Sequence, residues 1–209
     1  MHGGVTGASA DTSLAQRHHG RTSTSPASVH TAVEDVVPKL IDVLLRNRHE
    51  LLTVLTEIAT AQAAGDELLR SVRALAGVPG ELLRNSPRRP ARLATFLPSN
   101  NLLYSQVLSG VVPSLCTDEL RLRPSARGAR AALAVHEVLG PSLRRLGAGR
   151  IVMTPCPRKE FLTDRARSDA VVFTGRPENG AAVAARLPAG TLLLSFGSGP
   201  DPGGRRTRR

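Results

Sequence analysis

Short apolar segments alternate with helical segments in the second half of the chain, and this alternation constrains the fold more than any other feature. Between residues 92 and 196, five apolar runs of strand length are separated by four stretches with helical spacing. The expected strands cover residues 92–97, 119–123, 150–154, 169–173 and 191–196. The expected helices between them cover residues 102–115, 128–139, 158–167 and 178–185. This pattern predicts an α/β fold with a mostly parallel sheet and helices on both faces.

A helical pattern precedes this region. Apolar residues recur at spacings of three and four over residues 29–75. Pro38 predicts a helix start or a kink, and Gly65 predicts a break before a second helix that ends near residues 77–80. We therefore expect a unit of two or three helices with one apolar face, followed by a proline-rich linker.

The two ends of the chain lack apolar periodicity. The first is rich in Gly, Ser, Thr and His, so we expect it to be disordered, with His18 and His19 solvated rather than bound to a metal. The last residues are Gly, Pro and Arg and cannot form a core. The expected organisation is a disordered tail (1–27), a helical segment (28–84), an α/β domain (85–200) and a basic tail (201–209).

The chain is strongly basic, with a formal net charge of +11, and only Lys39 and Lys159 of its 28 basic residues are lysines. An arginine excess of this kind is typical either of nucleic-acid binding or of a protein from a GC-rich genome. The arginines are scattered and aromatic residues make up 2% of the chain, so few rings can stack on bases. The second interpretation is therefore favoured, and the first is kept as an alternative.

No apolar run reaches the roughly 18–20 residues that span a membrane, and the N-terminus lacks the apolar stretch of a secretory signal. The two cysteines, Cys116 and Cys156, have no zinc-site spacing. We expect a cytoplasmic protein with reduced thiols, no metal and no membrane association.

Small and polar residues follow the expected strands. In a parallel sheet these positions meet at the edge where ligands bind. The segments are Pro98-Ser99-Asn100-Asn101, Arg123-Pro124-Ser125, Thr154-Pro155-Cys156-Pro157 and Phe173-Thr174-Gly175-Arg176.

Three of these segments resemble motifs of the aldehyde dehydrogenases, in the same order and at similar spacing. Pro98-Ser99-Asn100 resembles a Pro-Trp-Asn motif, Leu122-Arg123-Pro124-Ser125 resembles Leu-Lys-Pro-Ser, and Phe173-Thr174-Gly175 matches Phe-Thr-Gly. The resemblance runs from about residue 92 to residue 200. It implies the Rossmann-like, NAD(P)-binding portion of an aldehyde oxidoreductase. Within the family, residues 173–179 and 196–199 most resemble the acyl-CoA or fatty-acid reductase branch.

The resemblance implies roles for individual residues. Asn100 matches the asparagine that donates to the oxyanion formed at the substrate carbonyl, although Asn is also a good helix N-cap. Arg123, followed by Ser125, matches the lysine that reaches the adenosine ribose and its neighbouring phosphate. The family often has an acid three positions after that lysine, where this chain has Ala126 and then Arg127. The missing acid and the two arginines favour NADP over NAD, unless both are ordinary surface cations.

The Thr174-Gly175-Arg176 turn is expected at the pyrophosphate. Gly175 would let the backbone approach the ligand, the following helix would present its N-terminus, and Thr174 and Arg176 would add hydrogen bonds. The alternative is a plain strand-to-helix turn. The usual G-x-G-x-x-G fingerprint is absent, as it is in the family that the chain resembles.

The sequence also departs from the family. Ser195 stands where the family has the glutamate that acts as general base, and the chain ends at Arg209, before the domain that carries the nucleophilic cysteine. Neither Cys116 nor Cys156 occupies that position, and a thiolate role for Cys156 lacks a histidine partner. We therefore expect a truncated or frame-shifted chain that does not turn over an aldehyde or acyl thioester unless a catalytic domain is supplied. The resemblance implies that intact relatives form homo-oligomers through the part that this chain is expected to lack. A catalytically inactive nucleotide-binding or scaffold module is the alternative.

Overall fold

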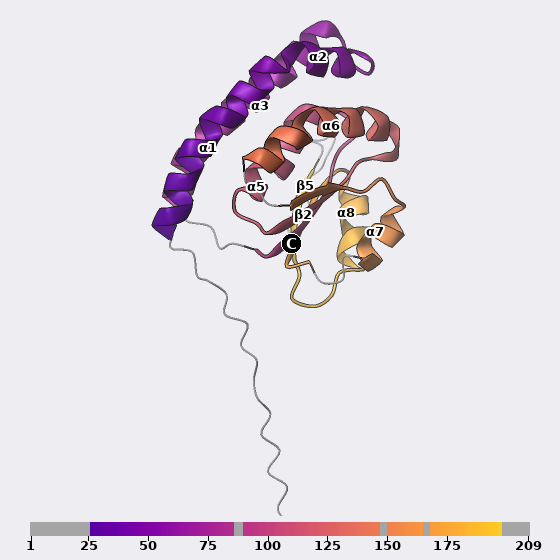
Figure 1. Cartoon of the computed structure of the whole chain (residues 1–209). Coiled ribbons are helices and arrows are strands. Elements are labelled where there is room, and N and C mark those ends of the chain that lie inside the picture. The colour runs from indigo at the N-terminus through magenta and orange to yellow at the C-terminus, as the bar shows by residue number, and fades with distance from the viewer. Residues whose placement is uncertain (1–25, 86–89, 147–149, 165–167, 198–209) are drawn as a thin grey trace, which may run out of the picture.

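The computed structural model describes residues 26–85, 90–146, 150–164 and 168–197 (Figure 1). The expectations for residues 1–25, including His18 and His19, and for residues 201–209 lie outside this part of the chain. The strands are β1 (Arg92–Phe96), β2 (Glu119–Arg123), β3 (Arg150–Met153), β4 (Ala170–Thr174) and β5 (Leu192–Phe196). The first three helices are α1 (Pro26–Arg46), α2 (Arg48–Thr56) and α3 (Ala61–Asn85). The others are α4 (Leu102–Gln106), the π-helix η1 (Val107–Val111), α5 (Val112–Ser114), the 3-10 helix η2 (Ala126–Gly128), α6 (Ala129–Arg145), α7 (Arg158–Asp164) and α8 (Pro177–Ala184).

The five strands form one sheet in the order β3-β2-β1-β4-β5, and every pairing is parallel. From β1 the chain first builds outward to β2 and β3. It then returns to the other side of β1 and continues through β4 to β5. The predicted α/β fold is confirmed, and the change of direction falls between β1 and β4. Loops that leave neighbouring strands in opposite directions open a crevice at the carboxyl ends of those strands.

The central strands β1 and β4 are buried on both faces, as expected for parallel strands joined by helices, whereas the edge strand β5 is largely exposed. Leu93 and Thr95 of β1, and Leu97 just after it, point to one face of the sheet. Ala94 and Phe96 point to the other face. The helical run α4-η1-α5 and α6 cover the first face, and α7 and α8 cover the second (Figure 1). The core is aliphatic apart from a cluster of rings on the second face, where the centroids of Phe96 and Phe161 lie 5.0 Å apart.

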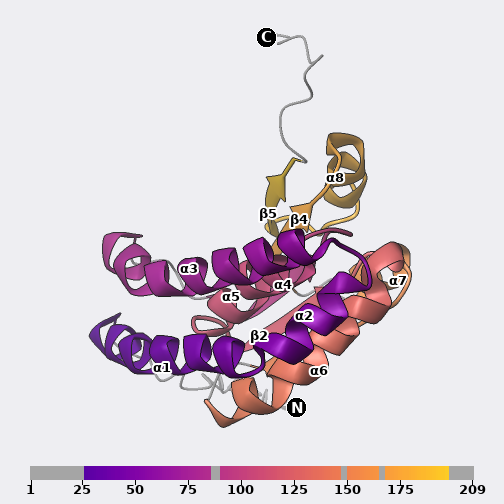
Figure 2. The same cartoon turned by 90° about the horizontal axis from the view of Figure 1, so that it is seen from above.

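The first three helices form a further layer outside the helices of the first face. Seen from above, α3 lies over α4 and α5, and α2 lies beside α6 (Figure 2). The apolar stripe of α1, which includes Val37 and Leu40, joins one buried cluster with Val107 of η1 and Val135 of α6. This cluster stabilises the helical layer through burial of apolar side chains rather than through helix propensity.

The predicted break at Gly65 is wrong, because Gly65 lies inside α3. The break is at residues 57–60, where the Thr60 hydroxyl accepts a hydrogen bond from the Ala63 N–H at 3.2 Å and begins the helix as an N-cap. The predicted end near residues 77–80 is also wrong, since α3 continues to Asn85. A Gly inside a helix costs about 1 kcal/mol, and the burial of Ala64 and Leu68 outweighs that cost.

In the part of the chain that the structure describes, three prolines each lie in the interior of an α-helix, which local rules do not predict. They are Pro38 in α1, Pro79 in α3 and Pro141 in α6, which extends beyond its expected end at residue 139. A proline inside a helix removes one hydrogen bond and costs roughly 3 kcal/mol. Buried neighbours such as Leu40 and Leu143 keep these helices packed on both sides of the proline.

The predicted helix over 102–115 contains a π-helical turn with an identifiable cause. Pro113 has no N–H to donate to the carbonyl of Ser109, four residues earlier. The Val112 N–H instead donates to the Val107 carbonyl, five residues back. Thr95, which is fully buried on the central strand β1, donates its hydroxyl to the Ser109 carbonyl at 3.1 Å. The sheet therefore supplies the donor that the proline removes.

Thr95→Val should lower the free energy of unfolding by about 1–3 kcal/mol, because it leaves the half-buried Ser109 carbonyl without its donor. Thr95→Ser keeps the hydroxyl and is the control. In a Pro113→Ala background, which restores a backbone N–H at position 113, Thr95→Val should cost less. Urea unfolding of the four proteins of this cycle measures the coupling. Equal stability of the Val and Ser variants would show that the hydrogen bond does not contribute.

No helix in the described part of the chain combines the length and the apolar character needed to cross a membrane.

Candidate functional site

A cleft of about 1370 Å³ opens at the carboxyl edge of the sheet, at the crevice between β1 and β4. This volume exceeds the roughly 300–1,000 Å³ of sites for drug-sized ligands. Its walls come from the loops after β1, β2 and β4, from the end of β5, and from the α4-η1 helix. The predicted residues that line it are Asn100, Arg123, Ser125, Thr174, Gly175 and Arg176.

The loop after β1 brings Asn100 to the cleft with an exposed side chain. The N-cap position of α4 is occupied by Asn101 rather than by Asn100, so the alternative helix-capping role does not fall to Asn100. Asn101 has a φ of 53°, in the left-handed region that costs a residue with a side chain about 1–2 kcal/mol. Its side chain makes no cap bond and instead accepts a hydrogen bond from Arg70 Nη2 at 2.9 Å.

Side chains of helix α3 contact this loop and the start of α4. The carboxylate of Glu67, which is only 4% exposed, accepts a hydrogen bond from the Tyr104 N–H at 3.0 Å. The guanidinium of Arg70 lies 5.2 Å from the centre of the Tyr104 ring. Glu67 thus satisfies the start of α4 that Asn101 leaves uncapped. Burial raises the pKa of Glu67, while the N–H groups of Tyr104 and Leu103 and the charge of Arg70 act in the opposite direction.

The raised pKa of Glu67 gives a testable pH dependence. Because the folded state binds this proton more tightly than the unfolded state, the contribution of the group to stability is fully present below pH 4.5, its ordinary pKa. That contribution is lost as the pH rises through the folded-state pKa. The free energy of unfolding of the natural protein, relative to Glu67→Gln, should therefore fall with rising pH.

Urea unfolding at a series of pH values measures this difference. Glu81→Gln, which changes an exposed carboxylate of the same helix, is the matched control. A difference between the natural protein and Glu67→Gln that grows with pH would contradict the assignment.

Arg123, the last residue of β2, is half-buried on the floor of the cleft. Its Nε donates to the Cys156 carbonyl at 2.8 Å, and its guanidinium lies 5.6 Å from the centre of the Phe96 ring. Burial lowers the pKa of Arg123, the electrostatic interaction with Cys156 acts in the opposite direction, and the charge of Arg158 lowers the pKa further. Arg123 is thus a fixed cation with donors left for a ligand.

The other two residues predicted near Arg123 are placed differently from each other. Ser125 lines the cleft, but its hydroxyl also accepts a hydrogen bond from the Gly128 N–H at 3.3 Å and caps η2. Arg127 is exposed within η2 and does not line the cleft. The tertiary structure therefore brings together Arg123 and Ser125 but not Arg127.

The turn after β4 is shaped by internal packing. A Cβ on Gly175 would lie 2.8 Å from the ring of Phe173, so the chain needs a glycine there whatever the ligand. The Gly175 N–H donates to the Phe196 carbonyl at 3.0 Å. Helix α8 then begins with Pro177, which has no N–H, and the Asn179 N–H donates to the Arg176 carbonyl at 3.0 Å. This turn offers a ligand few backbone donors, and its side-chain donors are Thr174 and Arg176.

One cationic residue of the cleft, Arg158, was not predicted from the sequence. Arg158 begins α7, and its Nη1 donates to Asn179 Oδ1 of α8 at 3.1 Å. Arg158 follows the third strand by five residues, and its place at the start of a helix on the ligand edge was the available signal. Cys156, in the same loop, does not line the cleft; it is not in a disulfide and packs against the cluster around Phe96.

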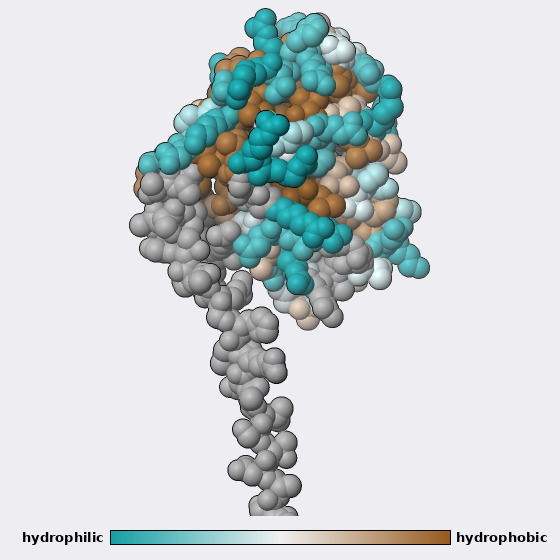
Figure 3. Space-filling view, viewed as in Figure 1, coloured by the Kyte–Doolittle hydropathy of each residue, from teal (hydrophilic) through white to brown (hydrophobic). Residues whose placement is uncertain are grey.

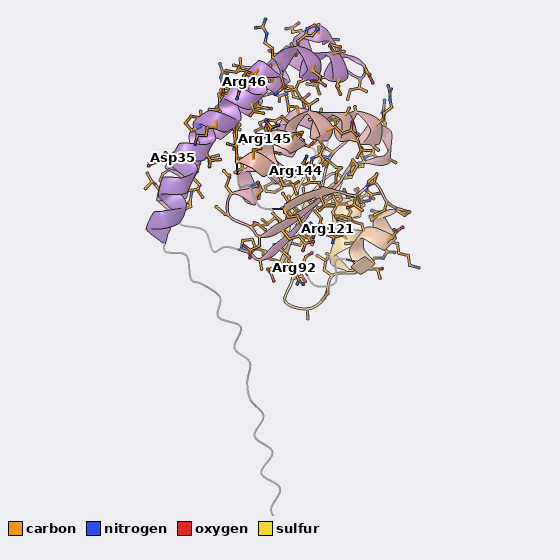
Figure 4. All side chains as sticks on the ribbon, in the orientation of Figure 1. Asp35, Arg46, Arg92, Arg121, Arg144 and Arg145 are labelled. Atoms are coloured by element: carbon orange, nitrogen blue, oxygen red, sulfur yellow. The ribbon has the colours of Figure 1, made fainter. Side chains whose placement is uncertain are left out.

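The cleft is cationic. Among the described residues that line it, Arg123, Arg158 and Arg176 carry positive charge and none is an Asp or Glu. Further arginines lie on the face shown in Figure 4: Arg144 and Arg145 on α6, and Arg92 and Arg121 on the strands. None of the residues labelled in that figure lines the cleft. Hydrophilic side chains spread over much of this face (Figure 3). The net charge is thus shared between the cleft and the wider surface.

Comparisons with known proteins concern the fold. No family model matches the sequence, and no curated protein matches it. Several solved structures do match. Aldehyde dehydrogenase 21 from Physcomitrella patens, in complex with succinate, has a TM-score of 0.63 and 19% identity over 85% of this chain and 40% of that chain. Glyceraldehyde-3-phosphate dehydrogenase from Methanocaldococcus jannaschii, complexed with NADP, has a TM-score of 0.67 and 12% identity over 81% and 42%.

The NAD-dependent benzaldehyde dehydrogenase from Corynebacterium glutamicum has a TM-score of 0.62 and 16% identity over 82% of this chain and 46% of that chain. Several aldehyde dehydrogenases of different substrates thus match the same chain at low identity. The chain spans less than half of the length of these structures, and over that span it has the fold of an aldehyde dehydrogenase.

Proposed function

We propose that the cleft binds a nicotinamide dinucleotide, and NADP in preference to NAD, as the cofactor-binding part of an aldehyde oxidoreductase. The observation that carries the proposal is the cleft at the β1–β4 crevice, with three arginines and no carboxylate among its described lining residues. A dinucleotide phosphate is an extended polyanion, and a cleft of this size and charge suits it. A carboxylate that accepts from ribose hydroxyls would repel a 2′-phosphate.

Each residue of the cleft has a proposed role that follows from its position. Arg123 supplies a planar donor fork at the end of β2. Thr174 and Arg176, at the end of β4, reach the diphosphate from the opposite side of the crevice. Ser125, at the start of η2, adds a hydroxyl to the same wall of the cleft. When bound, NADP would supply the hydride acceptor, or NADPH the donor, for chemistry at a substrate carbonyl.

Asn100 completes the proposal as the donor to the oxyanion of that carbonyl. Its amide lies in the cleft, and it is not used as the cap of α4. The loop that carries it is held by Glu67 and Arg70, and such preorganisation is what makes an oxyanion donor effective, typically by about 3 kcal/mol. The substrate class, an aldehyde or an acyl thioester, is a proposal from sequence resemblance, as is the acyl-CoA reductase branch.

A second candidate is a nucleotide-binding module without turnover. It is favoured by the absence of a carboxylate from the described lining and by Ser195, on β5, at the position of the general base. A hydroxyl cannot accept a proton as a carboxylate does at neutral pH. Measurement of NADPH formation with an aldehyde and NADP separates the two candidates, because the module would bind dinucleotide and produce none.

Calorimetric titration of the chain with NADP and NAD tests the binding itself. NADP should bind more tightly, and Arg123→Ala should weaken it roughly ten- to hundredfold, the equivalent of one hydrogen-bonded charge pair. Arg186→Ala, which removes an exposed cation that does not line the cleft, is the matched control and should bind as the natural protein does. Failure of both dinucleotides to bind at millimolar concentration would refute the proposal.

A further inference from the structure

Strand β5 lies at one end of the sheet, and its apolar side chains are exposed. It pairs with β4 on one side and, within the described residues, with no strand on the other. Leu192, Leu194 and Phe196 are 56%, 42% and 56% exposed. Leu194 is in register with Val172, which belongs to the buried cluster of the first face. The helices of that face stop short of β5, which lies at the opposite end of the molecule from α6 (Figure 2).

The two edge strands of the sheet differ in the features that keep an edge from pairing with another chain. Such edges are usually short, or carry charged side chains or prolines. The edge strand β3 has four residues, begins with the exposed Arg150 and is soon followed by Pro155. The sequence around β5, from residue 189 to residue 199, contains neither a charged residue nor a proline. An uncharged, apolar strand of this kind pairs readily with a further strand.

The outer side of β5 presents backbone groups at every second residue. The Leu192 N–H donates to the Asp169 carbonyl at 3.1 Å, and the Phe196 carbonyl accepts from the N–H that follows β4 at 3.0 Å. Residues 192 and 196 therefore direct these groups toward β4. Because the direction alternates along a strand, Leu193 and Ser195 direct their N–H and C=O groups away from β4. These are the donors and acceptors that an added strand requires.

We propose that β5 pairs in antiparallel orientation with β5 of a second copy of this chain, about a twofold axis at Leu194. The outward groups of Leu193 and Ser195 then form the hydrogen-bonded pairs with Ser195 and Leu193 of the second copy. Leu194 lies opposite Leu194 of the second copy, as a pair without backbone hydrogen bonds, in which side chains approach most closely.

This register follows from the positions of the exposed side chains. With the axis at Leu194, Leu192 lies opposite Phe196 of the second copy, and all six exposed apolar side chains form one continuous patch. With the axis at Leu193, Phe196 would instead lie opposite Gly190 and remain unpaired. Burial of apolar side chains therefore favours the first register.

A second copy suits this strand better than other occupants. With a net charge of +11, two copies repel one another over most of their surface, and β5 offers them a contact without charge. An acidic partner would need cations that the strand lacks. The segments outside the described structure are poorly suited to cover it: residues 198–209 include no large apolar side chain, and residues 1–25 include only Met1, Val5 and Leu14.

The contact is small, so the dimer should be reversible. One strand from each copy buries less than the roughly 800 Å² per partner of a standard interface. Analytical ultracentrifugation of the natural chain, from about 1 μM to 1 mM, should therefore show a monomer–dimer equilibrium. Growth beyond the dimer would contradict the proposal, because twofold pairing uses up the free side of both strands.

Two lysine variants test the apolar patch. Leu192→Lys places a charge in the patch, and it should raise the Kd for dimerisation roughly tenfold or more. Leu83→Lys changes an exposed leucine of α3 and is the matched control, which should dimerise as the natural chain does. Because Leu192 does not line the cleft, Leu192→Lys should bind NADP with an unchanged Kd. The dimer and the proposed function can thus fail separately.

Two further variants distinguish strand pairing from adhesion of apolar side chains. Ser195→Pro removes an outward N–H and leaves the hydrogen bonds to β4 in place, so it should weaken the dimer. Ser195→Ala keeps the N–H and should not. Urea unfolding of each variant excludes a loss of fold as the cause. A chain that stays monomeric at about 1 mM, or a dimer that Ser195→Pro and Ser195→Ala affect equally, would overturn the proposal.

Discussion

The parallel pairing of β1 with both β2 and β4 is the constraint on which the site depends. Because the chain leaves β1 toward β2 and later returns to its other side, the loops that follow β1 and β4 diverge. Side chains cannot fill the space between them, and a cleft remains at the carboxyl edge. The same pairing buries β1 on both faces, so that even its polar residue, Thr95, must find a partner in the helix above it.

The outer helices take part in the geometry of the cleft as well as in the core. Glu67 and Arg70 lie on α3, far in sequence from the loop that they hold. Their contacts stabilise a left-handed Asn101 and an uncapped helix start, both of which would be unfavourable alone. Unusual backbone that its surroundings over-determine is typical of functional loops. Asn100 precedes this point in the chain and lines the cleft.

The arginines of the cleft differ from the arginines of the surface in the groups that they contact. Surface arginines such as Arg46 pair with nearby carboxylates, here Asp42 at 2.7 Å, and such exposed pairs contribute little to stability. In the cleft, Arg123 and Arg158 have only neutral acceptors among the described residues. An anionic ligand would neutralise this charge. The proposed polyanion site therefore rests on the absence of carboxylates from the described lining as much as on the presence of arginines.

Much of the fold could be predicted from the sequence, because strand and helix periodicities are local. The strands begin and end within about one residue of their expected positions. Local rules failed at Gly65 and Pro141, where the burial of neighbouring side chains outweighs the intrinsic cost of Gly or Pro in a helix. The motifs after β1, β2 and β4 were found because strand ends in a parallel sheet converge on one edge.

What the sequence by itself determined is thus the type and order of the elements and the polar residues that follow the strands. The tertiary structure decided the strand order, and with it the side of β1 on which each loop lies. In the folded chain, Arg127 lies outside the cleft and Arg158 lines it. The Glu67 carboxylate accepts a hydrogen bond from the Tyr104 N–H. These contacts join residues far apart in the chain, and the direction of each side chain depends on how helices pack on the sheet, which no local pattern encodes.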